Sequence, residues 1–422
     1  MPRTDELTAV SFQQEEMLHN IRAFPDCAQR YHNSFLFRLT GDVDVDRLAH
    51  SIGDLVAHHR VLGTTLAVRD GADWQHVAGS AGPEFVDIRR AAPDETVVDI
   101  AAGLVRRRYG IEELCDGEPL FRPEIHLLTD DSVLLVLTLH HVLYDGWAIS
   151  VLWRDLSEIY TARCEKRRPE LPEQAIDYVE YTCRQREFWD RNRDDVMRYW
   201  REATASCPSD VAWPGPGDAA AAPFTTTTVT YDASRKQVAR IREMSRSAQV
   251  SPFMVLLPAT AATLAAVTEQ DHLLLGVDTA NRVDPAVHNL AGFCLNTRLI
   301  PLAWPARRPF AELVRSVRTS WLEADQFQEA YVDQILRELG RPEVLKINML
   351  SEALDTTTLD LPGVDATPVD LPMSSLYWRP VYTEWRLAPG EYRLHITYQR
   401  SRIDPNAITS WTRELGDLLD RI

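Results

Sequence analysis

The sequence predicts an α/β protein built from two halves of about equal size. In both halves, short apolar runs typical of strands alternate with segments whose apolar residues recur every three or four positions, as in helices. The stretch from Trp213 to Pro223 is rich in proline, glycine and alanine and is the clearest linker or surface loop in the chain. The 422 residues, 45% of them hydrophobic, suffice for two to three average domains or two large ones.

The first half begins with a strand pattern at 35–39, followed by Asp44 as the cap of a helix that runs to Val56. Residues 121–128 and 133–139 predict a hairpin with a polar turn. The run 133–139 is apolar along its whole length, so we expect both of its faces to be covered.

A helix is predicted directly after Gly146, where apolar residues fall at helical spacing. Two prolines break the pattern between residues 169 and 175, and a further helical segment contains Trp189 and Trp200.

The second half repeats the same alternation of helices and strands. It predicts helices at 253–267 and 310–321 and a strand at 273–277. Strict alternation of apolar and polar residues from Tyr392 to Tyr398 indicates a half-buried strand. Residues 407–422 predict an amphipathic closing helix.

The most informative motif is the run His140-His141-Val142-Leu143-Tyr144-Asp145-Gly146, at the end of the apolar strand. Neighbouring strand residues point to opposite faces, so only one histidine can face a given cavity. A neutral imidazole can accept a proton at neutral pH. Asp145 either holds a histidine tautomer or pairs with a distant cation, and Gly146 permits a positive φ or a close backbone approach.

This motif resembles the His-His-x-x-x-Asp-Gly pattern of the condensation-domain family of nonribosomal peptide synthesis, within the chloramphenicol acetyltransferase-like superfamily. Weaker resemblances occur in family order at 11–18, 58–66, 177–181 and 291–297, so they span most of the chain. The sequence departs from the family at Arg60, Gly63 and Asp325, and the seventh motif near 345–348 is barely recognisable. These changes leave the histidine motif intact.

The resemblance implies two chloramphenicol acetyltransferase-like lobes, residues 1–175 and 176–422, forming a V-shaped pseudodimer with a central active-site channel. By the family pattern His141 is the base or the residue that positions the acceptor, and His140 is structural. Asp145 is expected to pair with Arg282, and the backbone N–H groups around Gly146 and Trp147 to stabilise an oxyanion. Further candidates for the channel wall are Trp147, Asn296, Thr297, Ser374 and Ser375.

The expected function is a free-standing condensation enzyme that transfers an acyl or aminoacyl group from a carrier protein to an amine or a hydroxyl. The donor would arrive on the phosphopantetheine arm of a carrier acting in trans, and no intrinsic cofactor is expected. One alternative is an O-acyltransferase that uses acyl-CoA, although the plant-type Asp-Phe-Gly-Trp-Gly signature is absent. A minor alternative is a non-catalytic recruitment module, which the intact motif from His140 to Gly146 disfavours.

Composition argues against other classes of function. The net charge of −17 disfavours a nucleic-acid partner or an anionic membrane surface. The six cysteines are widely spaced, so neither a metal site nor a disulfide framework is indicated, and Cys294 is expected to be a small buried filler. There is no signal-peptide core and no 18-residue apolar stretch, so a cytoplasmic location is expected. Basic clusters at 106–108 and 166–168 are expected to be solvated helix faces or docking spots for an acidic partner.

Overall fold

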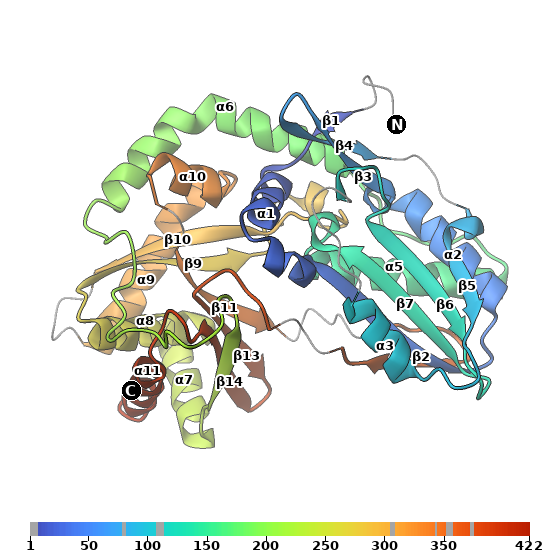
Figure 1. The fold of residues 1–422 in the computed structure, drawn as a ribbon. Coiled ribbons are helices and arrows are strands. Elements are labelled where there is room, and N and C mark those ends of the chain that lie inside the picture. Colours follow the sequence, from blue (N-terminus) through green and yellow to red (C-terminus); the bar gives the residue numbers. More distant parts are fainter. Residues whose placement is uncertain are drawn as a thin grey trace. The chain divides into compact units, whose positions relative to one another are not determined.

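The computed structural model describes residues 7–77, 82–106, 114–303, 309–341, 344–351, 358–371 and 375–422. The elements are mixed α/β, as expected, and fall into two units (Figure 1). The first unit holds the described residues within Met1–Glu187, Arg282–Cys294 and Leu354–Ser374, and the second holds the remainder. The expected division at residue 175 differs from these units, because two later segments pack with the N-terminal part of the chain.

The first unit is built on a five-stranded sheet in the order β12-β2-β7-β6-β5. All neighbours pair antiparallel except β5 and β6, which are parallel. Every residue of β7 is buried, which confirms that both faces of this strand are covered. The strands are β2 (His32–Gly41), β5 (Asp87–Arg90), β6 (Phe121–Leu127), β7 (Val133–His140) and β12 (Val364–Val369).

Helices cover both faces of this sheet. Leu36 of β2 packs with Ile100 of α3, and the next residue, Phe37, contacts the ring of Trp153 of α5 on the opposite face. Helices α2 and α5 pack against each other (Figure 1). As expected, the Asp44 side chain caps α2. The helices are α1 (Phe12–Ala23), α2 (Val45–His58), α3 (Val97–Arg106) and α5 (Gly146–Glu165).

A smaller three-stranded sheet in the order β1-β4-β3 completes the first unit. Its strands are β1 (Thr8–Ala9), β3 (Thr64–Arg69) and β4 (Ala72–Val77). Short 3-10 turns are η2 (Pro25–Tyr31), η3 (Arg60–Gly63), η4 (Pro83–Phe85), η5 (His141–Leu143) and η6 (Pro285–Val287).

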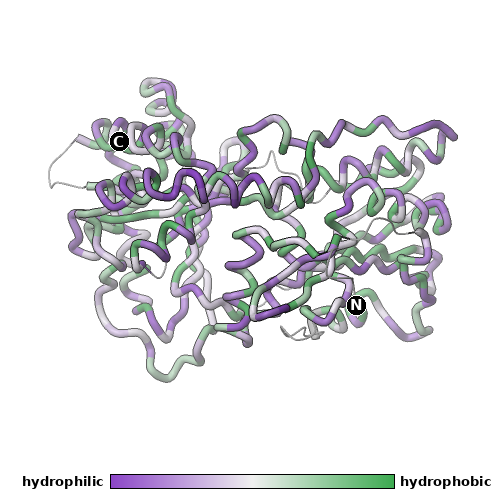
Figure 2. The backbone as a smooth tube through the Cα atoms, turned by 90° about the horizontal axis from the view of Figure 1, so that it is seen from above, coloured by the Kyte–Doolittle hydropathy of each residue, from purple (hydrophilic) through white to green (hydrophobic). Residues whose placement is uncertain are grey.

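The long helix α6 (Tyr178–Ala203) contains the boundary between the two units. It is mostly hydrophilic along its length (Figure 2). Most of its buried residues are separated by three, four or seven to eight positions, which places them on one stripe of the helix. They include Tyr178, Tyr181, Trp189, Val196 and Trp200.

The second unit contains a six-stranded sheet in the order β10-β9-β11-β13-β14-β8. Strand β11 runs parallel to both β9 and β13, and the other pairs are antiparallel. The strands are β8 (Thr226–Asp232), β9 (His272–Thr279), β10 (Asn296–Ala303), β11 (Leu345–Ser351), β13 (Val381–Ala388) and β14 (Glu391–Gln399). The helices are α7 (Arg235–Ala248), α8 (Phe253–Thr268), α9 (Phe310–Ala324), α10 (Val332–Glu338) and α11 (Pro405–Leu419), and the 3-10 turn η7 (Asp325–Phe327) follows α9.

Helix α8 lies at the centre of the second unit and contacts α7, α9 and α11. Nearly all of its residues are buried, which agrees with the apolar pattern that predicted a core helix. Within the described residues, no single helix is long and apolar enough to cross a membrane. The bent pair α7–α8 passes that test only when the two helices are taken together.

Thr260 of α8 joins two buried tryptophans in this core. Its hydroxyl accepts a hydrogen bond from the Trp385 indole N–H at 3.0 Å, and its carbonyl accepts one from the Trp411 indole at 3.1 Å. Trp385 and Trp411 are both 0% exposed. The hydroxyl therefore satisfies a donor that water cannot reach.

We expect Thr260→Val to lower the free energy of unfolding by about 1–3 kcal/mol, because the Trp385 N–H is left without its acceptor at nearly unchanged side-chain volume. Denaturant titration measures the change. Thr409→Val in α11 is the control, since Thr409 is an exposed helical threonine that also donates to a backbone carbonyl. Equal effects of the two substitutions would contradict the assignment.

Candidate active site

The histidine motif lies where β7 ends and α5 begins. His140 is the last residue of β7, His141 opens the turn η5, and Asp145 is the N-cap of α5. The strand is fixed by its two neighbours and the helix by its packing on α2, so the short loop between them is held at both ends. This is the strand–loop–helix placement that the sequence predicted.

The His141 imidazole has a defined tautomer. Its Nδ1 lies 2.9 Å from the Tyr144 carbonyl oxygen, which can only accept, so Nδ1 carries the proton and donates it. Nε2 of the neutral ring is therefore the proton acceptor. Burial lowers the pKa of His141, although the bond to the Tyr144 carbonyl opposes this effect. The ring is thus kept neutral, and available as a base, at neutral pH.

Two aromatic rings fix the plane of this imidazole. His141 stacks on Tyr144 with ring centroids 4.8 Å apart and an interplanar angle of 10°. Phe293 lies 5.1 Å from it at a tilt of 55°. The Tyr144 hydroxyl in turn accepts a hydrogen bond from Asn33 at 2.6 Å. Sequence reasoning missed Tyr144 and Phe293, because they occupy positions without chemistry of their own.

His140 lies in a different environment from His141. His140 is 0% exposed, and its Nδ1 accepts a hydrogen bond from the Val142 N–H at 3.2 Å. Its ring forms an edge contact with the His32 ring, with centroids 4.5 Å apart. Burial lowers the pKa of His140 well below the usual value, so the ring is neutral. These contacts support the structural role expected for His140.

The Asp145 carboxylate is fully engaged inside the first unit. It accepts from Arg282 through Nη1 at 3.0 Å and Nη2 at 3.1 Å, from the Ala148 N–H at 2.8 Å and from the Cys294 N–H at 2.9 Å. The side chains of Asp145 and Arg282 are each 2% exposed. Of the two roles left open for Asp145, the structure places it against the distant cation, while the Tyr144 carbonyl sets the His141 tautomer.

Arg282 also organises its own segment, by donating to the carbonyl oxygens of Leu290 and Gly292 at 3.2 and 3.3 Å. Gly292 approaches the Tyr178 ring so closely that a Cβ there would lie 2.2 Å from a ring carbon. The absence of a side chain at residue 292 is therefore needed for this packing. Cys294 is buried, and burial raises the pKa of its thiol to about 12, so it is not activated as a nucleophile.

Residues of two weaker motifs, 11–18 and 177–181, form hydrogen bonds to the backbone of the histidine motif and of the 293–294 segment. Gln14, two positions into α1, donates to the Val142 carbonyl at 3.2 Å. The Tyr178 hydroxyl donates to the Phe293 carbonyl at 2.8 Å and bonds to Ser11 at 2.9 Å. Gln13 donates to the Cys294 carbonyl at 3.3 Å and to the Tyr181 hydroxyl at 3.1 Å. These side chains therefore position the 293–294 backbone and the motif loop.

The candidate residues of the second unit are held by internal contacts. Asn296 donates to the carbonyls of Gln328 and Ala330 at 3.1 and 2.9 Å and accepts from the Val332 N–H at 3.1 Å. The Thr297 hydroxyl donates to Asp278 at 2.6 Å. Both polar groups therefore support the turn that leads into α10 and the end of β9.

Three further candidates have simpler surroundings. The Trp147 indole donates to the His288 carbonyl at 2.9 Å. The Ser375 carbonyl accepts from the Thr226 N–H at 2.8 Å, and Ser374 lies outside the described residues. Gly146 is exposed, and a Cβ on it would meet no atom of the described residues within 4 Å. Neither the positive φ nor the close backbone approach expected at Gly146 occurs, because the residue begins α5 with helical geometry and open space beside it.

One of the departures from the family pattern, Asp325, lies in a defined ion pair. Asp325 is paired with Arg298, whose guanidinium lies 4.4 Å from the centre of the Trp321 ring. In the basic cluster 106–108, residues 107 and 108 lie outside the described residues. Arg167 is paired with Glu158 and Glu165, so it is not an isolated positive charge.

The family profile described as "Condensation domain" matches residues 5–358. The chain belongs to the condensation-domain family. This confirms the resemblance inferred from the histidine motif. Malpinin synthetase from Mortierella alpina is 27% identical over 353 residues, which are 81% of this chain and 4% of that protein. The dimodular nonribosomal peptide synthase of Bacillus subtilis is 29% identical over 326 residues, or 74% of this chain and 13% of that protein.

Solved structures confirm the expected fold. The X-domain from teicoplanin biosynthesis has a TM-score of 0.82 at 20% identity, covering 100% of this chain and 96% of that one. The complex of the X-domain and OxyB gives the same TM-score and identity, with 94% of that chain covered. The chain therefore shares a whole condensation-type fold, while it spans a small part of the synthetases that it resembles in sequence.

We expect Asp145→Ala to lower the free energy of unfolding by about 3–5 kcal/mol, because it leaves the Arg282 guanidinium buried without its counter-charge. Arg282→Ala should lower the free energy of unfolding by a similar amount, because it leaves the Asp145 carboxylate buried without its cation. Thermal and denaturant unfolding of the purified variants measure both. The matched control is Asp54→Ala, which breaks an exposed ion pair with Arg163 and should cost at most about 1 kcal/mol. Equal losses at Asp145 and Asp54 would contradict this account.

Proposed function

We propose that the chain catalyses a condensation in which an acyl or aminoacyl thioester, carried on the phosphopantetheine arm of a carrier protein, is transferred to an amine or a hydroxyl. The observation that carries this proposal is the His141 imidazole. It is neutral, its Nδ1 proton is committed to the Tyr144 carbonyl, and its Nε2 is the proton acceptor. An acceptor nucleophile needs such a base.

In the proposed reaction the acceptor nitrogen or oxygen attacks the thioester carbonyl carbon while Nε2 of His141 takes its proton. The carbonyl oxygen becomes the oxyanion of a tetrahedral intermediate. Collapse of this intermediate breaks the carbon–sulfur bond, and the thiolate leaves as a thiol with the proton returned by His141. The amide or ester forms without a covalent enzyme intermediate, because bringing both substrates together supplies much of the acceleration.

The start of α5 supplies a group that can stabilise the oxyanion. The first N–H groups of a helix have no partner within the helix and carry its positive dipole end. Gly146 and Trp147 are the first two residues of α5, and the open space beside Gly146 leaves room for a reacting carbonyl. This part of the proposal needs no resident metal or cofactor.

We expect His141→Ala to reduce turnover by about 10²-fold or more, while the melting temperature changes little, because the ring is half-buried and its loop is held by other contacts. Single-turnover assays with a loaded carrier and a saturating acceptor measure the loss. Near-wild-type turnover by a folded His141→Ala protein would rule out both the base and the positioning roles.

The pH dependence separates a base from a residue that only positions the acceptor. Because the pKa of His141 is lowered, the ring stays unprotonated to a pH below 6.5, and activity should fall only at more acidic pH. His141→Gln keeps a hydrogen-bonding side chain but does not titrate. Its residual rate should lack this acid limb, whereas an unchanged limb would assign the titration to another group.

We expect a carrier-bound donor to be used with at least about tenfold higher kcat/KM than the same acyl group on CoA or N-acetylcysteamine, because protein–protein contacts add binding energy. Product formation followed by mass spectrometry with each of the three donors tests this. Equal kcat/KM values would remove carrier recognition from the proposal and favour the acyl-CoA-dependent alternative.

A second candidate function is recruitment of another enzyme without catalysis. The observation that favours it is the similarity to the X-domain, whose structure is known in a complex with OxyB. The histidine motif distinguishes the two candidates, since recruitment needs no base. If the wild-type chain forms no product with any donor, recruitment becomes the better account.

A further inference from the structure

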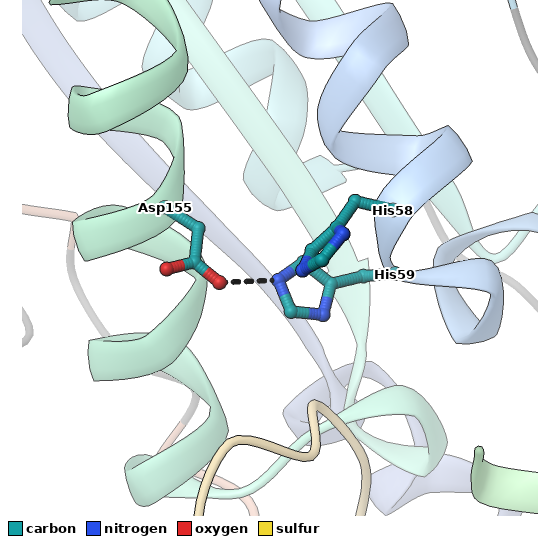
Figure 3. A group of neighbouring side chains, drawn as sticks. All are labelled: His58, His59 and Asp155. Atoms are coloured by element: carbon teal, nitrogen blue, oxygen red, sulfur yellow. Dashed lines mark hydrogen bonds and ion pairs between the residues drawn. The ribbon is translucent and has the colours of Figure 1, made fainter. Parts of the chain in front are cut away.

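A second histidine cluster lies in the first unit, apart from the histidine motif. His58 is the last residue of α2, and His59 leaves the helix with φ −102° and ψ 79°. In a continuing helix, adjacent side chains would point about 100° apart. The turn out of the helix instead brings the two rings together, with centroids 4.7 Å apart and planes at 80°. Figure 3 shows the two imidazoles side by side, facing the Asp155 carboxylate.

Asp155 reaches this cluster from α5. Its Oδ2 lies 2.8 Å from Nε2 of His59, and both residues are 1% exposed. One donor atom from each of His58, His59 and Asp155 lies within 4.8 Å of the other two. Nε2 of His58 is shielded from water and has no hydrogen-bond partner among the described residues. A buried ring nitrogen in that state needs an explanation.

We propose that His58, His59 and Asp155 bind a divalent transition-metal ion of the zinc type, at a site separate from the condensation chemistry. Two imidazole nitrogens and one carboxylate oxygen form a ligand set suited to zinc, with a fourth position left for water. With bonds of about 2.0–2.1 Å, tetrahedral ligand atoms lie about 3.3 Å apart. The His59–Asp155 contact therefore has to open by roughly 0.5 Å when the metal replaces the proton between them.

The neighbours of the cluster suit this role. Arg154 donates to Oδ1 of Asp155 at 2.7 Å, which leaves Oδ2 as a single-oxygen ligand. The Gln174 amide lies 2.7 Å from Nδ1 of His59. When the metal occupies Nε2, Nδ1 carries the ring proton, and a half-turn of the Gln174 amide presents its oxygen to accept it. The Arg154 side chain is 43% exposed, so the cluster lies close to the surface of the first unit.

Metal binding here would join the end of α2 to the middle of α5. In the metal-free state the His59 ring donates its Nε2 proton to Asp155, because Nδ1 accepts from the Gln174 amide as placed. Binding at Nε2 moves that proton to Nδ1, so the His59 ring stays neutral and changes only its tautomer. The expected effect is on stability, because a ligand that binds only the folded chain raises its melting temperature.

The experiment uses the full chain, treated with a chelator and then dialysed against zinc or cobalt. We expect about one ion per chain by elemental analysis, and visible absorption of tetrahedral cobalt. The melting temperature should rise by at least about 3 °C when the free zinc concentration is about one hundred times the Kd. His58→Gln and Asp155→Asn should each weaken binding at least about tenfold.

The matched control is His50→Gln, since His50 is an exposed histidine of the same helix whose Nδ1 is bonded to the Asp46 carbonyl. It should bind metal as the wild type does. Absence of stoichiometric uptake by the wild type, or equal affinity of His58→Gln and His50→Gln, would overturn the proposal and leave a hydrogen-bonded pair. If Asp155→Asn fails to fold, the half-buried His58→Gln variant decides the question. Condensation activity is a separate readout and does not enter this test.

Discussion

The Asp145 carboxylate is the contact on which the rest of the candidate site depends. One side chain starts α5 through the Ala148 N–H, neutralises Arg282 and holds the Cys294 N–H. A buried carboxylate is tolerated only when its oxygens are satisfied in this way. Because it ties the motif loop to the 282–294 segment, it also brings Phe293 against the His141 ring.

The residues of the weaker motifs contribute support rather than chemistry. Three of their side chains donate to backbone carbonyls: Gln13 to residue 294, Gln14 to residue 142 and Tyr178 to residue 293. These bonds hold the backbone of the histidine motif and of its neighbouring segment in place. Backbone carbonyls offer acceptors at fixed positions, so such contacts define geometry independently of substrate. This explains how the motifs at 11–18 and 177–181, which are individually weak in sequence, converge on one place in the first unit.

Local patterns predicted most elements, because a strand such as β7 or a helix such as α5 depends on periodicity within a few residues. The histidine motif also located the candidate base. Which carbonyl sets the His141 tautomer could not be predicted, since that depends on the turn geometry at Tyr144. The His58–Asp155 cluster was missed because its partners are 96 to 97 positions apart and form none of the short-spaced ligand motifs.

The assignment of residues 282–294 and 364–369 to the first unit has a consequence for how the protein is made. Strand β12 covers the edge of β2, and Arg282 lies 137 positions after its partner Asp145. At ordinary rates of translation the N-terminal part waits on the order of ten seconds or more for these segments to be synthesised. During that time β2 has an unpaired edge and Asp145 lacks its cation. A fragment ending near residue 187 would be fixed in that state, and would be prone to aggregation or dependent on chaperones.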